Sequence, residues 1–199
     1  ERQFDLFKTW AGCFQTELYE MLGKRYVMYG EWLYAKHTVY YDRLTHYFME
    51  FDIYDKENGV YLSTAARRKL LRQCPFVESV LVLYEGRLDS LNQLVSYLGR
   101  SHFKSDRYEE SLREQCEEQG QNWDLVKRQT DRSDLMEGIY IKVEEDDMVT
   151  DRFKYVRSTF LNTILDSETH WLNRPVIPNR LAPGIHLFEN PAGRGESGL

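Results

Sequence analysis

Two cationic side chains that could handle phosphate lie in the segment RFKYVR, residues 152–157. Arg152 and Lys154 are two residues apart, so in a strand both side chains lie on the same face and can approach one phosphate. Cations placed in this way stabilise the charge that develops on phosphorus during phosphoryl transfer. Arg152 offers a planar fork of donors, whereas Lys154 offers a compact charge.

A second segment, EGIYIK at residues 137–142, has an acid at one end and a base at the other. Glu137 supplies the carboxylate oxygen that hard divalent cations prefer. Strand alternation places Lys142 on the opposite face from Glu137. Two interpretations therefore stay open. Either Glu137 lies outside regular strand geometry, or Lys142 contacts something other than the phosphate that Glu137 serves.

Two earlier segments combine acidic and aromatic residues: YGEW at 29–32 and FDIYD at 51–55. Taken alone, Glu31 is most simply a surface glutamate on a strand. Phe51 alone is most simply a core residue that shares a strand face with Tyr47, Met49 and Ile53. Only their order and spacing relative to the two later segments give these residues a chemical meaning.

Apolar periodicity and turn residues predict the elements that carry these segments. The predicted helices are 4–22 (ended by Gly23), a basic helix at 63–74, 87–98, 106–118 and 158–168. The predicted strands are 24–34, 46–55 and 77–86, and a hairpin with an acidic tip covers 136–157. Because strands come in hairpin-like pairs, the fold class is α+β, with mostly antiparallel sheets and flanking helices.

The composition excludes several classes of protein. A formal net charge of −6 excludes a generally basic nucleic-acid binder, so any polynucleotide must be held by a local basic patch. Three cysteines without paired spacing argue against a disulfide framework or a zinc site and favour a cytoplasmic location. No apolar run approaches the length of a membrane span, so no membrane partner is expected.

In this order and at these spacings, the four segments resemble the nucleotidyltransferase motifs of the ATP-dependent polynucleotide ligases and capping enzymes, in particular those of the RNA ligase branch. The resemblance covers roughly residues 1–180. It implies an ATP-grasp-like nucleotidyltransferase domain, incomplete at its N-terminus, over residues 1–172, followed by a Pro/Gly-rich tail over 173–199 that we expect to be irregular or extended.

The resemblance also implies an activity, the sealing of RNA ends in RNA repair. In such ligases a lysine attacks ATP to give lysyl-AMP, the AMP moves to a 5′-phosphate, and a 3′-hydroxyl displaces it. The implied cofactors are ATP and Mg²⁺ or Mn²⁺, and the implied partners are RNA ends with a 5′-phosphate and a 3′-hydroxyl. The kind of RNA and the oligomeric state stay open.

By resemblance, Glu31 accepts hydrogen bonds from the ribose hydroxyls, and Gly30 lets the backbone approach the nucleotide. Phe51 stacks on adenine, with Asp52 beside it, and Lys142 belongs to the same nucleotide site. The catalytic group comprises the metal ligand Glu137 with Arg152 and Lys154, where the family usually has Lys at the first of these two cationic positions.

One motif of the family has no counterpart in this sequence. The nucleophilic lysine belongs to a Lys-x-(Asp/His)-Gly phrase upstream of the other motifs, and Lys56-Glu57-Asn58-Gly59 is better explained as a hairpin turn. We therefore expect this chain alone to lack the adenylated lysine and to be inactive in that step. The alternatives are a non-catalytic nucleotide- or RNA-binding module, or a DNA ligase or capping-type enzyme, which would normally continue into an OB-fold.

Overall fold

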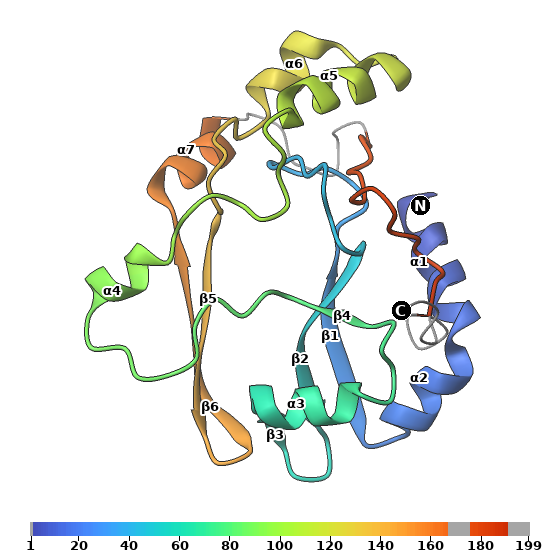
Figure 1. Cartoon of the computed structure of the whole chain (residues 1–199), viewed down its shortest axis with the longest axis vertical. Helices are drawn as coiled ribbons and strands as arrows, with labels where there is room; N and C mark the ends of the chain where they lie inside the picture. Colours follow the sequence, from blue (N-terminus) through green and yellow to red (C-terminus); the bar gives the residue numbers. More distant parts are fainter. Residues whose placement is uncertain (1, 167–175, 191–199) are drawn as a thin grey trace, which may run out of the picture.

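Six strands form one open sheet in the order β1-β2-β3-β6-β5, with β4 beside β2 (Figure 1). The computed structural model describes residues 2–166 and 176–190. The strands are β1 (Tyr26–Trp32), β2 (Phe48–Asp55), β3 (Val60–Leu62), β4 (Glu78–Ser79), β5 (Gly138–Glu145) and β6 (Met148–Val156). All pairings are antiparallel except that of β2 with β4, which confirms the predicted fold class.

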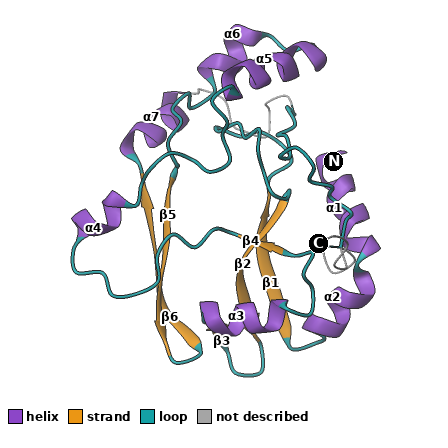
Figure 2. Cartoon of the chain, in the orientation of Figure 1, coloured by secondary structure: helices purple, strands orange, loops and turns teal. Residues whose placement is uncertain are grey.

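The helices lie around this sheet (Figure 2). They are α1 (Arg2–Cys13), α2 (Gln15–Leu22), α3 (Thr64–Leu71), α4 (Leu91–Ser96), α5 (Tyr108–Glu118), α6 (Trp123–Arg128) and α7 (Ser158–Asp166). The apolar sides of α1 and α2 pack on the outer face of β1 and β2, where Trp10 and Phe14 meet Phe48 and Ile53 in the main core. Within the described residues, no helix has both the length and the apolar character needed to cross a bilayer.

The sheet divides into two limbs. The first limb is β1 with β2, and the second limb is the β5–β6 hairpin. Their joint is β3, which pairs with the end of β2 and with β6 through Tyr61↔Val149 and Leu62↔Met148. Figure 1 shows the limbs diverging from this joint, so their inner faces look toward each other.

The helix predicted over 4–22 is two helices. The backbone leaves helical geometry at Phe14 (φ −113°, ψ 21°), and the Phe14 ring stacks on Phe76 with centroids 4.0 Å apart. Gly23 ends α2 as predicted, with φ +52° and its N–H donating to the Tyr19 carbonyl. The stacking contact explains the break, because an uninterrupted helix would aim Phe14 elsewhere.

The prediction of a strand over 77–86 was wrong beyond the first residues of that range. Only Glu78 and Ser79 pair with β2, and Leu81 and Tyr84 are exposed. The helices predicted at 87–98 and 106–118 are shorter than expected, and the last helix is described as far as Asp166. The sequence analysis missed α6, although Asn122 caps it by accepting a hydrogen bond from the Leu125 N–H.

The basic helix predicted at 63–74 begins at its Ser63 cap, as expected, but its charges are not all on the surface. Arg67 is 2% exposed and forms an ion pair with Glu50, which is fully buried on β2. The Ser79 hydroxyl donates to the same carboxylate at 2.8 Å. This buried network joins α3, β2 and β4.

The turn after β2 is held by Asp55. Its carboxylate accepts two hydrogen bonds from the Arg25 guanidinium, at 3.0 and 2.6 Å, and further ones from Glu57 and Asn58. Gly59 closes the turn with φ +70° and donates its N–H to the Asp55 carbonyl. The interpretation of Lys56-Glu57-Asn58-Gly59 as a turn is therefore confirmed.

This arrangement predicts an acid-sensitive contribution to stability. The hydrogen bonds from Arg25 hold the pKa of Asp55 well below its usual range. A depressed folded-state pKa gives stability that is present above the unfolded value of about 3.9 and is lost as the pH falls toward the folded value. Asp55→Asn should therefore melt at a lower temperature than wild type at pH 7, and the difference should shrink below about pH 5.

Thermal melts across this pH range measure the effect. Asp89→Asn is the matched control, because the Asp89 side chain is 78% exposed and pairs with an exposed Arg87. A melting difference for Asp55→Asn that stays constant with pH would contradict the assignment.

Residues 176–190 are irregular, as predicted for the tail, but they pack on the body of the fold. Asn179 is 2% exposed: its side chain accepts from the Tyr41 N–H and donates to the Leu33 carbonyl. Bridges join Ala35 to Pro178 and Leu44 to Leu181. The domain boundary at residue 173 stays a prediction.

Candidate active site

The second limb presents its charged residues to the inner side of the sheet. In the register of the hairpin, Lys154 lies opposite Tyr140 and Arg152 lies opposite Lys142. Residues directly opposite in an antiparallel pair share a face, so these four side chains point the same way. The predicted common face of Arg152 and Lys154 is therefore confirmed.

The first limb contains a β-bulge at the predicted stacking residue. Tyr29 pairs with Asp52 and Gly30 with Glu50, so Phe51 is the extra residue in β2. A bulge interrupts the alternation of faces, and bulges are common next to active sites. Here it allows both Phe51 and Asp52 to contact Tyr140 of the second limb, while Ile53 enters the core. Phe51 is thus not the core residue that its spacing alone suggests.

Asp52 is the centre of a cluster that bridges the limbs. The Lys142 ammonium lies 2.7 Å from its Oδ1, and the Tyr140 hydroxyl donates to its Oδ2 at 2.8 Å. The Arg152 guanidinium lies 3.4 Å from the same Oδ2. The Asp52 side chain is 2% exposed, so this carboxylate is almost completely surrounded by its partners.

Lys142 also donates to the carbonyl of Phe51, and burial lowers its pKa. It therefore contacts β2 rather than the surroundings of Glu137. Both interpretations left open by strand alternation are correct. Glu137 lies just before β5, which begins at Gly138, so it is outside regular strand geometry. Lys142 has a partner of its own, the Asp52 carboxylate. Lys142 lies on the inner face, opposite Arg152, and its assignment to the nucleotide site stays a prediction.

The sequence analysis did not single out Tyr140. Because Tyr140 is two residues from Lys142 in the same predicted strand, alternation would have placed both side chains on one face. Burial and its hydrogen bond to Asp52 raise the pKa of Tyr140 to about 12, so the hydroxyl is a donor at neutral pH. Its ring meets Phe51 edge-on, with centroids 6.1 Å apart.

A second group lies further along the inner face, around Glu137. Its carboxylate accepts a hydrogen bond from the Tyr41 hydroxyl, a contact that the sequence analysis missed. Burial raises the pKa of Glu137, and the charge of Glu31 raises it further, while Lys154 and the buried Lys104 act to lower it. The charges of Glu31 on β1 and Lys154 on β6 therefore both act on Glu137, which precedes β5.

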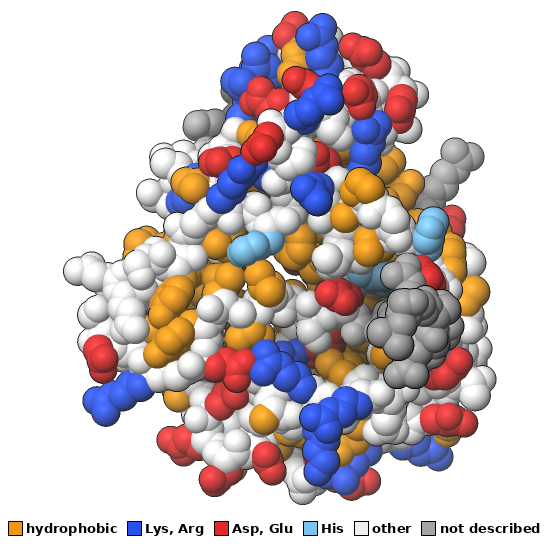
Figure 3. Space-filling model, in the orientation of Figure 1, with side chains coloured by type: hydrophobic (Ala, Val, Ile, Leu, Met, Phe, Trp, Pro, Cys, Tyr) orange, Lys and Arg blue, Asp and Glu red, His pale blue; other side chains and the backbone are white. Residues whose placement is uncertain are grey.

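Glu31 combines exposure with an unusual environment. The residue is exposed to solvent, yet desolvation raises its pKa, with Lys154 acting in the opposite direction. A side chain that water can reach while protein surrounds it on several sides lines a concave surface. Figure 3 shows such a hollow near the middle of the molecule, with hydrophobic side chains around it.

Gly30 has a packing role. A Cβ at this position would lie 2.4 Å from the Phe48 ring and 2.8 Å from the Met49 carbonyl oxygen. The space that a side chain would need is therefore filled by Phe48 on the core side of β1, and the approach of the backbone to a nucleotide stays a prediction.

Gly138 is required by the hairpin itself. A Cβ would lie 2.1 Å from the Tyr155 carbonyl oxygen, which is too close to be relieved without moving backbone. Gly138→Ala should destabilise the protein by about 1–3 kcal/mol, the usual cost of overpacking, and should displace the neighbouring Glu137.

Thermal melts of the two variants Gly138→Ala and Gly12→Ala provide the comparison. Gly12 lies within α1 and a Cβ there meets nothing within 4 Å, so the control should be neutral or stabilised by up to about 1 kcal/mol. A wild-type melting temperature for Gly138→Ala would show that the strands separate easily at this point.

The residues around Glu137 fit a magnesium or manganese ion that takes most of its ligands from water and from the phosphates of a bound substrate. Mg²⁺ usually keeps several waters and binds one or two carboxylates together with substrate phosphates. Glu137 and the nearby Glu31 supply such a partial set. Within residues 2–166 and 176–190, no group of three or more His, Cys, Asp or Glu could hold a metal on its own.

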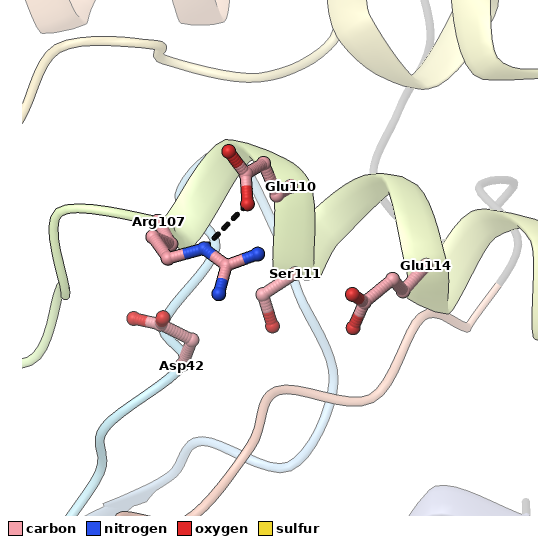
Figure 4. A pocket seen from close by; sticks show the side chains of 5 residues that line it. All are labelled: Asp42, Arg107, Glu110, Ser111 and Glu114. Atoms are coloured by element: carbon pink, nitrogen blue, oxygen red, sulfur yellow. Dashed lines mark hydrogen bonds and ion pairs between the residues drawn. The ribbon is translucent and has the colours of Figure 1, made fainter.

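A separate polar pocket lies beside the start of α5, where it is lined by Asp42, Arg107, Glu110, Ser111 and Glu114 (Figure 4). Arg107 turns toward Glu110 and Asp42 binds Ser105, so its charged groups are already satisfied locally. None of the predicted site residues contributes to it.

Comparison with known protein families identifies the class of protein to which this chain belongs. A family model described as RNA ligase matches residues 1–156. The matched region contains both limbs and every predicted site residue, from Glu31 to Lys154. Comparison with the curated proteins and with the solved structures gives no match.

The chain therefore belongs to the RNA ligase family. At the level of the family, this makes it a ligase-type protein whose substrates are RNA and nucleotides.

Proposed function

We propose that this protein is the nucleotide-binding domain of an ATP-dependent RNA ligase, which joins 5′-phosphate and 3′-hydroxyl ends through enzyme–AMP and RNA-adenylate intermediates. The observation that carries the proposal is the convergence of four distant segments on one inner face. Asp52 of β2 pairs with Lys142 of β5 and Arg152 of β6, while the charge of Lys154 acts on Glu31 and Glu137.

The inner face offers two environments that suit the two ends of a nucleotide. Around Phe51 and Tyr140 it is aromatic, which suits a base, because stacking on an aromatic ring contributes about 1–3 kcal/mol per base. Around Glu137 and Lys154 it is charged, which suits phosphates. Glu31, on β1 beside this charged group, would accept hydrogen bonds from ribose hydroxyls.

Glu137 is the residue that would hold the divalent ion, with Glu31 as its neighbour. When bound, Mg²⁺ or Mn²⁺ would neutralise charge on the reacting phosphate. Tyr41 fixes the orientation of the Glu137 carboxylate. Lys154, on the inner face of β6, would stabilise charge that grows on phosphorus during the reaction.

The sealing step tests this proposal on the chain as it stands. The substrates are an RNA that already carries AMP on its 5′-phosphate and a second RNA with a free 3′-hydroxyl, with magnesium present. The hydroxyl oxygen attacks the 5′-phosphate phosphorus and loses its proton, and the bond to AMP breaks. This step requires no lysine nucleophile, so a joined product and released AMP are expected.

Covalent labelling with radiolabelled ATP separates the remaining alternatives. We expect label on a version of the protein extended upstream and none on this chain. Label on the short chain would mean that one of its own lysines is the nucleophile, with Lys36 and Lys56 the first to replace. If neither version is labelled and pre-adenylated RNA is not joined, the protein is a binding module.

A further inference from the structure

Three tyrosines occupy neighbouring strands on the inner face, next to the Asp52 cluster. Tyr29 lies on β1, Tyr54 on β2 and Tyr61 on β3. The Tyr54 and Tyr61 rings lie directly opposite each other, with centroids 4.9 Å apart, and the Tyr29 ring lies 6.0 Å from that of Tyr61. Together they form a continuous aromatic surface at the closed end of the cleft.

Arg152 covers part of this surface. Its guanidinium carbon lies 3.9 Å from the centre of the Tyr61 ring, and the same group reaches Asp52 at 3.4 Å. Contacts with Tyr61 and Tyr140 raise the pKa of Arg152, so it stays cationic. A planar guanidinium stacks on a ring in a way that a lysine ammonium does not, which gives the arginine at this position a specific purpose.

The fold explains only part of this arrangement. Tyr54 and Tyr61 form a cross-strand pair that stabilises the joint of the sheet. Tyr29 is 41% exposed and the Arg152 side chain is 40% exposed, so neither is placed there by core packing. An exposed aromatic ring beside a stacked guanidinium is a combination that recognises unpaired nucleobases.

We propose that Tyr29, Tyr61 and Arg152 form a stacking site for an unpaired base of the RNA strand that is being joined. This deepens the proposed function, on which it rests, by naming single-stranded nucleotides near the RNA end as the substrate. Two observations favour this occupant. Asp52 contacts both Arg152 and Tyr140, so the stacking site is continuous with the nucleotide site, and Arg152 brings local positive charge to a chain of net charge −6.

The proposal separates the roles of two residues that share a strand face. Arg152 contacts Tyr61 and Asp52, whereas Lys154 acts on Glu31 and Glu137. Lys154 therefore serves the reacting phosphate, and Arg152 serves a base. The choice of arginine at position 152 then has a measurable consequence, because lysine would keep the charge and lose the stack.

Binding of a fluorescent single-stranded RNA of about ten nucleotides, a length typical of one binding site, tests this by anisotropy on the full chain. Arg152→Lys and Tyr29→Leu should each weaken binding about 5- to 150-fold, the range expected for loss of a base–aromatic stack. Tyr29→Phe should bind like wild type because the ring remains. Tyr19→Leu, at a 64% exposed tyrosine on α2, is the matched control.

A second RNA, with the bases removed from its terminal nucleotides, shows whether stacking is responsible. Arg152→Lys and wild type should bind this abasic RNA with the same affinity. Equal binding of base-bearing RNA by wild type and Arg152→Lys would overturn the proposal. It would indicate that Arg152 contacts a phosphate rather than a base. An equal loss on both RNAs would overturn it as well.

The two proposals fail in different ways. If pre-adenylated RNA is not joined but Arg152→Lys still loses affinity for base-bearing RNA, the ligase proposal falls and the stacking site stands. If RNA is joined and the variants bind it as wild type does, the stacking site falls alone.

Discussion

Replacing Lys154 by alanine is expected to slow the joining of pre-adenylated RNA by about 100- to 1,000-fold, the usual effect of removing one group that stabilises a charged transition state. Lys154 lies on the inner face of β6 and acts on the carboxylates of both Glu31 and Glu137. Its loss removes the cation that acts on Glu31 and leaves only Lys104 acting on Glu137, where negative charge must increase. Single-turnover rates at saturating RNA measure this step without a contribution from binding.

Two controls define the result. Lys154→Arg keeps the charge and should retain part of the rate. Lys8→Ala, at a side chain that is 71% exposed on α1, should react as the wild type does. If Lys154→Ala reacts nearly as fast as the wild type, another residue of the inner face supplies the catalytic charge.

The largest effect on stability is expected for Glu50→Ala. Glu50 is fully buried and pairs with Arg67, which is 2% exposed, so the variant leaves a buried cation without its partner. Breaking a buried pair on one side costs about 3–5 kcal/mol. For a chain of this size, this corresponds to a fall in melting temperature of about 6–20 °C.

The double variant Glu50→Leu with Arg67→Met distinguishes the cost of an orphaned charge from the value of the pair. Replacement of both partners by apolar residues is often neutral or stabilising, so the double variant should be more stable than Glu50→Ala. Glu85→Ala removes the partner of Arg68 in an exposed pair and should cost less than about 1 kcal/mol. A double variant that is less stable than Glu50→Ala would contradict this interpretation.

The local rules of strands and turns predicted much of the site. Alternation placed Arg152 and Lys154 on one face, and the Asn-Gly turn after β2 followed from its sequence. These features depend on neighbours in the chain, so composition and spacing suffice to predict them.

Other features depend on contacts between distant segments and could not be predicted in this way. The bulge at Phe51 is defined by pairing with β1, and it alone explains how adjacent residues both meet Tyr140. The basic helix at 63–74 was predicted without its buried ion pair, because Glu50, the partner of Arg67, is 17 residues away. The apolar run after Val77 suggested a buried strand, but the sheet offers it a place only at Glu78 and Ser79.

The short joint between the limbs is supplemented by contacts beside it. β3 meets β6 through two residue pairs, whereas β5 and β6 pair along most of their length. Beside this ladder, the Glu144 carboxylate accepts hydrogen bonds from the Thr64 N–H and hydroxyl, and the Ser63 N–H donates to the Asp147 carbonyl. The ion pairs from Asp52 to Lys142 and Arg152 lie beside this joint and connect the two limbs directly. An anionic ligand that competes with Asp52 for these cations would weaken these ion pairs between the limbs as it binds.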